Sequence, residues 1–96
     1  MPTSELLPEF RRDYARLTDE EKKAFRLAVK KLVVDLRRGQ IRAGLRVKAV
    51  QGYEGIYEMT WAGAGRATFD YGSSKVPGEP HIRWRRIGGH DILKNP

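Results

Sequence analysis

The residues from His81 to Leu93 are of the types that bind phosphate groups and move protons. A period of two divides the start of this run into two faces, a polar one with His81, Arg83 and Arg85 and an apolar one with Ile82 and Trp84. Arg86 falls on the apolar face near its rim, and His90 follows the flexible Gly88-Gly89 pair. Arginine forks bind phosphate oxygens and an imidazole transfers protons near neutral pH, so the run predicts a phosphate site with an acid or base beside it.

The length and charge of the chain limit what it can be. Its 96 residues predict one small domain, residues 1–96, with a single core. A net charge of +7 and a pI near 10.1 favour an anionic partner, most commonly nucleic acid. The absence of cysteine excludes disulfides, thiolate zinc sites and cysteine nucleophiles. The first residues do not resemble a signal peptide, and no apolar run reaches the ~20 residues of a membrane helix, so a cytoplasmic protein is expected.

Two helices are expected in the first forty residues. The first covers about residues 7–17, with Pro8 in its first turn and an apolar stripe of Phe10, Tyr14 and Leu17. The second begins at a capping box between Thr18 and Glu21 and stops at Gly39. Its apolar stripe is Phe25, Ala28, Val29, Leu32, Val33 and Leu36. Because almost no loop separates them, the two helices are predicted to form a hairpin over about residues 7–38.

The other exposed positions of the second helix are of two kinds. Its lysines, Lys22, Lys23, Lys30 and Lys31, are interpreted as a solvated outer face. Leu27 and Val34 lie off the main apolar stripe, and the sequence leaves open whether the first helix or a partner covers them.

Beyond residue 44 the period changes from helical spacing to two. Four strands are predicted, at residues 45–50, 56–61, 66–71 and 81–88. A loop with two prolines at residues 72–80 precedes the last strand, and residues 89–96 form a tail. Short connections favour an antiparallel meander over about residues 45–88. The predicted fold is therefore α+β, with the helical hairpin packed on one face of a four-stranded antiparallel meander.

Alternation gives the predicted sheet one apolar and one polar face, provided that the loop around Gly63 keeps the strands in register. The core face collects Leu45, Val47, Ala49, Tyr57, Met59, Trp61, Ala67, Phe69, Tyr71, Ile82 and Trp84. The open face collects Arg46, Lys48, Glu58, Thr60, Arg66, Thr68, Asp70, His81, Arg83 and Arg85. Cations spread over ~15 to 20 Å of sheet suit a single-stranded nucleic-acid backbone better than a small molecule.

Three residues on or near the open face have two interpretations each. Glu58 is either an ion-pair partner of Arg66 or Lys48, or a catalytic base. His90 is either a surface residue after a Gly-Gly turn or an acid or base beside the arginines. Asp91 fits a cap of the terminal turn better than a group that orients the imidazole.

The order of these segments resembles the RelE/ParE superfamily of bacterial toxin–antitoxin toxins, and most closely its RelE-type and phage Gp49/HigB-like members. The resemblance covers nearly the whole chain. It rests on Leu45-Arg46-Val47-Lys48, on Gly55-Ile56-Tyr57-Glu58-Met59 leading to Gly65-Arg66-Ala67, and on Trp84-Arg85-Arg86-Ile87-Gly88-Gly89-His90-Asp91-Ile92-Leu93. Many relatives open with a strand, whereas Met1 to Leu6 is a poor strand, so that edge is expected to be missing or only a stub.

The resemblance implies a ribosome-dependent endoribonuclease that cuts mRNA without a metal or any other cofactor. The 2′-hydroxyl would attack the adjacent phosphate while cations stabilise the phosphorane. The catalytic residues that it implies are His90, Arg85, Arg66 and Lys48. The RNA-binding residues that it implies are Arg46, Arg83, His81 and Arg86, with His81 as the second acid or base candidate.

The resemblance also implies partners and leaves two other functions open. The partners are a cognate antitoxin, the ribosome and mRNA. ParE-type members poison DNA gyrase instead of cutting RNA and generally lack the catalytic residues, so a supercoiling assay separates that function. A non-catalytic RNA-binding module predicts salt-sensitive binding without cleavage.

Overall fold

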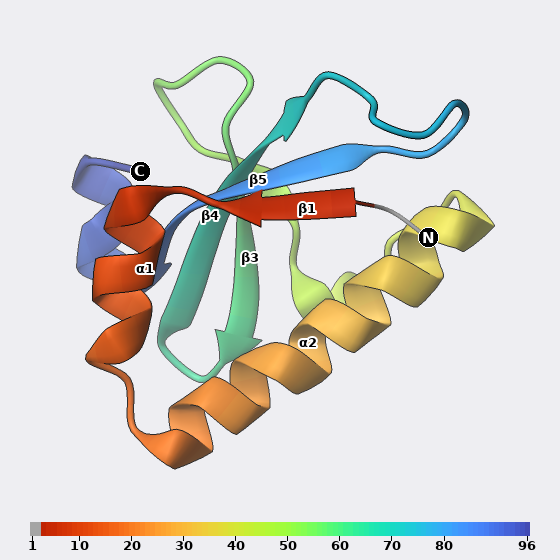
Figure 1. The fold of residues 1–96 in the computed structure, drawn as a ribbon. Helices are drawn as coiled ribbons and strands as arrows, with labels where there is room; N and C mark the ends of the chain where they lie inside the picture. Colours follow the sequence, from red (N-terminus) through yellow and green to blue (C-terminus); the bar gives the residue numbers. More distant parts are fainter. Residues whose placement is uncertain (1–2) are drawn as a thin grey trace.

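The computed structural model describes residues 3–96 (Figure 1). Its elements in chain order are β1 (Thr3–Leu6), α1 (Pro8–Ala15), α2 (Asp19–Arg38), a 3₁₀ turn η1 (Ala43–Leu45), β2 (Lys48–Ala49), β3 (Tyr57–Ala62), β4 (Gly65–Gly72), β5 (His81–Gly88) and a second 3₁₀ segment η2 (His90–Lys94). The predicted α+β class is confirmed. Neither α-helix within residues 3–96 combines the length and apolar character needed to cross a membrane.

The sheet differs from the predicted four-stranded meander. It has five strands in the order β1-β5-β4-β3-β2, and β1 runs parallel to β5 whereas the other pairs are antiparallel. The first strand, which was expected to be missing or only a stub, is present as a short strand in which residues 3–6 pair with residues 81–84. This edge strand is only half-buried or exposed, so its pairing depends on hydrogen bonds and not on an apolar face.

The two helices cover one face of the sheet but do not lie side by side. Figure 1 shows them diverging from their short connection, with α1 packed on β5 and α2 crossing β3. The predicted hairpin is therefore open. The start of α2 follows the prediction, since Thr18 Oγ1 accepts from Glu21 N at 3.1 Å and Glu21 Oε1 accepts from Thr18 N at 2.8 Å. The helix ends at Gly39 with φ 77°.

Aromatic side chains from both layers form the centre of the core. The Trp84 ring lies 5.2 Å from Phe25 and 5.3 Å from Phe69, measured between centroids, and Phe10 lies 5.6 Å from Phe25. The core also buries Met59, Ala67 and Ile82, as the alternation predicted. Two predicted core residues are outside it, because Tyr71 is 45% exposed and Ala49 lies on the short outer strand β2.

Two irregularities change the predicted strands. Residues 45–50 do not form one strand, because η1 ends at Arg46 in the left-handed region with φ 50°, and β2 has only two residues. A bulge between β4 and β5 pairs Thr68 with Arg86 and Phe69 with Trp84. Arg85 is the extra residue. After the bulge, Ile87 is opposite Ala67 and enters the core, which strict alternation did not predict.

Candidate functional site

A hollow beside the short strand β2 brings together a cation, a carboxylate and an imidazole. Lys48 on β2 pairs with Glu58 on β3, and both line the hollow with His90 from η2. Ala49, Val50, Gln51 and Leu93 complete the lining, and the volume is about 430 Å³. The hollow is therefore an open, polar site in which an imidazole, a carboxylate and an ammonium group line the same space.

Glu58 is the most buried charged group of this hollow. It is 6% exposed, and its Oε1 lies 3.8 Å from Arg66 Nε. Arg66 also donates to the backbone oxygens of Gly63 at 3.2 Å and Gly65 at 3.0 Å, so the tight β3–β4 turn fixes its guanidinium. Arg66 therefore lies next to Glu58, as expected if the two residues form an ion pair.

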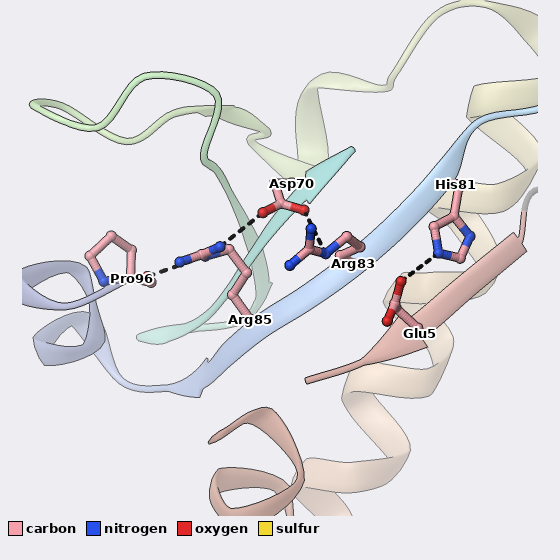
Figure 2. Close-up of polar contacts among 6 residues, drawn as sticks. All are labelled: Glu5, Asp70, His81, Arg83, Arg85 and Pro96. Carbon is pink, nitrogen blue, oxygen red and sulfur yellow. Dashed lines mark hydrogen bonds and ion pairs between the residues drawn. The ribbon is translucent and has the colours of Figure 1, made fainter. Parts of the chain in front are cut away.

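A second cluster lies along β4 and β5, and Figure 2 shows Asp70 between two arginines. Arg85 Nη1 donates to Asp70 Oδ2 at 2.8 Å, and Arg83 Nε lies 3.4 Å from Asp70 Oδ1. Arg85 Nε also donates to the backbone oxygen of Pro96 at 3.3 Å. One carboxylate therefore pairs with both Arg83, predicted to bind RNA, and Arg85, predicted to be catalytic. About 39% of the Arg83 side chain and 29% of the Arg85 side chain remain exposed.

His81 is separated from both clusters by its contacts with the edge strand. Its Nε2 donates to Glu5 Oε1 at 2.8 Å, and its Nδ1 is hydrogen-bonded to Thr3 Oγ1 at 2.7 Å (Figure 2 shows the Glu5 contact). The hydrogen bond from His81 lowers the pKa of Glu5. With 5% exposure and both nitrogens occupied, His81 fastens β1 to β5 instead of facing solvent.

The fold matches solved structures of toxins from toxin–antitoxin systems. The RelB–RelE antitoxin–toxin complex from Methanococcus jannaschii matches with a TM-score of 0.63 and 17% identity over 94% of each chain. YafQ from E. coli strain BL21(DE3) matches with a TM-score of 0.64 and 14% identity over 97% of this chain and 98% of that one. The E. coli DinJ–YafQ toxin–antitoxin complex matches with a TM-score of 0.65 and 16% identity over 96% of each chain. The chain has the RelE-type toxin fold.

This fold is the one that the sequence resemblance implied. No protein-family model matches the sequence, and no curated protein matches it significantly. The likeness therefore concerns the fold alone, and the chemistry of the chain depends on its own side chains.

The C-terminal tail of the chain, which carries His90, folds back onto the sheet. Tyr53 Oη donates to the Lys94 oxygen at 2.9 Å, and Ile92 is buried. Together with the contact between Arg85 and Pro96, these contacts hold η2 beside β4 and β5. Asp91, which was expected to cap the terminal turn, gives η2 no side-chain cap.

The two remaining predicted RNA-binding residues lie apart from the hollow. Arg46 is exposed at the end of η1 and does not belong to a strand. Arg86 donates to Asp13 Oδ2 at 2.6 Å and to the Asn95 oxygen at 3.1 Å, and the contact with Asp13 raises the pKa of its guanidinium. Arg86 thus ties α1 to β5 at the rim of the core face. Among residues 3–96, no three histidine or acidic side chains are grouped as a metal site would require.

Proposed function

We propose that this RelE-type chain is the toxin of a type II toxin–antitoxin system and that it cleaves mRNA on the ribosome, thereby inhibiting translation. The observation that carries the proposal is the hollow shared by Lys48, Glu58 and His90, with Arg66 beside Glu58. These groups are the ones that metal-free RNA cleavage needs: a base, an acid and cations around a phosphate.

In the proposed reaction, the Glu58 carboxylate takes the proton of a ribose 2′-hydroxyl. The 2′-oxygen then attacks the adjacent phosphorus while the bond to the 5′-oxygen of the next nucleotide breaks. The protonated imidazole of His90 gives its proton to that leaving oxygen. The products are a 2′,3′-cyclic phosphate and a free 5′-hydroxyl, and no other reactant is needed. A general acid and a general base each contribute about 10²- to 10⁴-fold in such reactions.

The cations divide into two groups in this proposal. Lys48 and Arg66 border the hollow and stabilise the negative charge of the phosphorane. Arg83 and Arg85 extend along β5 and bind the phosphates of neighbouring nucleotides, for which Arg85 must turn from Asp70 towards the RNA. The spread of the four cations over β2, β4 and β5 suits a single strand laid across the sheet.

The proposal includes a cognate antitoxin as the partner that controls the toxin. Two of the solved relatives are antitoxin–toxin complexes, one of RelB with RelE and one of DinJ with YafQ. The formal charge of +7 on this chain would attract an acidic antitoxin segment. In this proposal the protein works in the cytoplasm, where ribosomes and mRNA are present.

The test is single-turnover cleavage of mRNA on programmed ribosomes by the His90→Gln and Glu58→Gln variants. We expect each rate to fall by about 100-fold or more, because each variant lacks one proton-transfer group. Lys94→Ala is the matched control, since it removes an exposed cation from the same 3₁₀ segment outside the hollow. Near-normal cleavage by both variants would overturn the assignment. RNA binding without cleavage by the wild type would favour a binding module, and inhibition of gyrase supercoiling would favour a ParE-type toxin.

A further inference from the structure

We propose that the outer face of α2 is a docking surface for an acidic amphipathic helix of a partner protein. Two aliphatic side chains stand out on this face, with Leu27 49% exposed and Val34 48% exposed. The sequence leaves open what covers these two residues, and in the structure α1 diverges from α2 (Figure 1) and both residues stay exposed. Single exposed aliphatic residues are common, but these two belong to one stripe.

The spacing of the two residues makes a short ridge along the helix. Seven positions correspond to almost two turns, so Val34 lies within roughly 20° of Leu27 around the axis and about 10 Å further along it. The opposite side of the helix, which carries Phe25, Ala28 and Leu32, is buried against the sheet. A partner helix that lies along the ridge would therefore bury both side chains at once.

Cations border the ridge on both sides, one turn before and one turn after each aliphatic residue. Lys23 and Lys30 lie on one side of the ridge, and Lys31 and Arg38 lie on the other. All four are exposed. An apolar seam bordered by charges is the arrangement with which paired helices select their partners. The matching partner has leucine-like residues along its seam and glutamates or aspartates beside it.

Beyond the first turn of α2, which carries Asp19 and Glu20 one turn before Lys23, this face has no exposed carboxylate. Between Lys22 and Arg38 the only acidic residue is Asp35, which is fully buried and accepts from Arg42 at 2.7 and 2.8 Å. Arg38 lies 3.9 Å from that carboxylate, and its side chain stays 69% exposed. An acidic segment of another molecule would therefore supply the carboxylates for Lys30, Lys31 and Arg38.

The chemistry favours an acidic protein helix over the two other occupants. A nucleic-acid backbone would pair with the cations but would leave Leu27 and Val34 unburied. A second copy of this chain would bring the same cations against each other. Because α2 covers the face of the sheet opposite the hollow, a helix bound there leaves Glu58 and His90 free. The inference thus concerns a surface separate from the proposed cleavage site and does not depend on cleavage.

The probe is a synthetic helical peptide of about 21 residues, or three heptads, with leucine at the seam positions and glutamate on both sides of the seam. Fluorescence anisotropy of the labelled peptide is measured with the full chain and with the Leu27→Ala/Val34→Ala double variant. We expect the double variant to bind about tenfold more weakly, because it offers less apolar surface to bury. Val76→Ala is the matched control, because Val76 is an aliphatic residue of similar exposure, 43%, in the loop before β5.

Four results would contradict the inference. The first is no binding of the acidic peptide, and the second is equal binding by the wild type and the double variant. The third is a loss of affinity for single-stranded RNA in the double variant, which would assign the ridge to nucleic acid. The fourth is a wild-type dimer in sedimentation equilibrium that the double variant does not form, which would assign the ridge to a second copy. A peptide with lysine in place of glutamate should not bind, and normal mRNA cleavage by the double variant would keep this test separate from the proposed function.

Discussion

Replacing Asp70 by asparagine should strengthen RNA binding, because Asp70 occupies the two arginines that extend from the proposed cleavage site. Its carboxylate lies 2.8 Å from Arg85 Nη1 and 3.4 Å from Arg83 Nε. Asparagine keeps the shape of the side chain but gives up its charge. Each phosphate neutralised on a single strand adds about 0.7 to the slope of log K against log salt concentration. Two released arginines would therefore steepen the slope by up to about 1.4, which is roughly a sevenfold additional loss of affinity for a fourfold rise in salt.

The assay is fluorescence anisotropy of a labelled single-stranded RNA, titrated at several salt concentrations between about 50 and about 200 mM. Glu54→Gln is the matched control, since it changes the net charge equally but in the exposed turn before β3. Thermal unfolding of both variants establishes that they are folded. If Asp70→Asn gave the same salt slope as Glu54→Gln, the reasoning that Asp70 holds these arginines away from RNA would be refuted.

Three further predictions concern the stability of the fold. Phe69→Ala should lower the free energy of unfolding in urea by about 3–5 kcal/mol, because the ring is fully buried beside Trp84; a loss below about 1 kcal/mol would contradict this. Thr18→Ala should lower the melting temperature by about 4–8 °C, as expected for a lost helix cap worth about 1 kcal/mol, whereas Thr18→Ser should keep it. Arg42 lowers the pKa of Asp35 from 3.8 to about 2, so this carboxylate stabilises the fold above about pH 4 and the gain is lost as the pH falls towards 2. In acid titrations followed by circular dichroism, Asp35→Asn should lack that part of the pH dependence; an unchanged acid transition would exclude the role.

The helix α2 and the central strands follow directly from sequence patterns. The capping box at Thr18 and the glycine at position 39 bound α2 because both act through local backbone hydrogen bonds. Alternation placed Met59, Phe69 and Trp84 in the core because one face of these strands is buried. Local chemistry and burial therefore account for the parts that were predicted correctly.

The parts that were missed depend on non-local pairing or on backbone irregularity. Strand β1 has almost no apolar alternation, and its partner β5 is more than seventy residues away in the sequence. The bulge at Arg85 and the left-handed conformation of Arg46 both interrupt a period of two. Arginine at these positions does not predict either irregularity. As a result, Ile87 in the core and Arg46 off the strand were not anticipated.

The candidate site was predictable as a set of residues but not as a set of distances. The alternation placed Lys48, Glu58 and Asp70 on one face, and the structure groups the first two with His90. Alternation could not predict that Asp70 forms ion pairs with both Arg83 and Arg85, because it gives the face of a side chain and not its rotamer or its partner. The sequence likewise gave no sign that His81 is occupied by the edge strand.

The parallel pairing of β1 with β5 has a consequence for the order of events during synthesis. Thr3 emerges from the translating ribosome long before His81, its neighbour in the finished sheet. The nascent chain therefore has one strand without a partner until residues 81–84 have been made, and closing such a distant pair is slow compared with forming a helix. For a chain with this topology, β1 can join the sheet only after β5 has been synthesised.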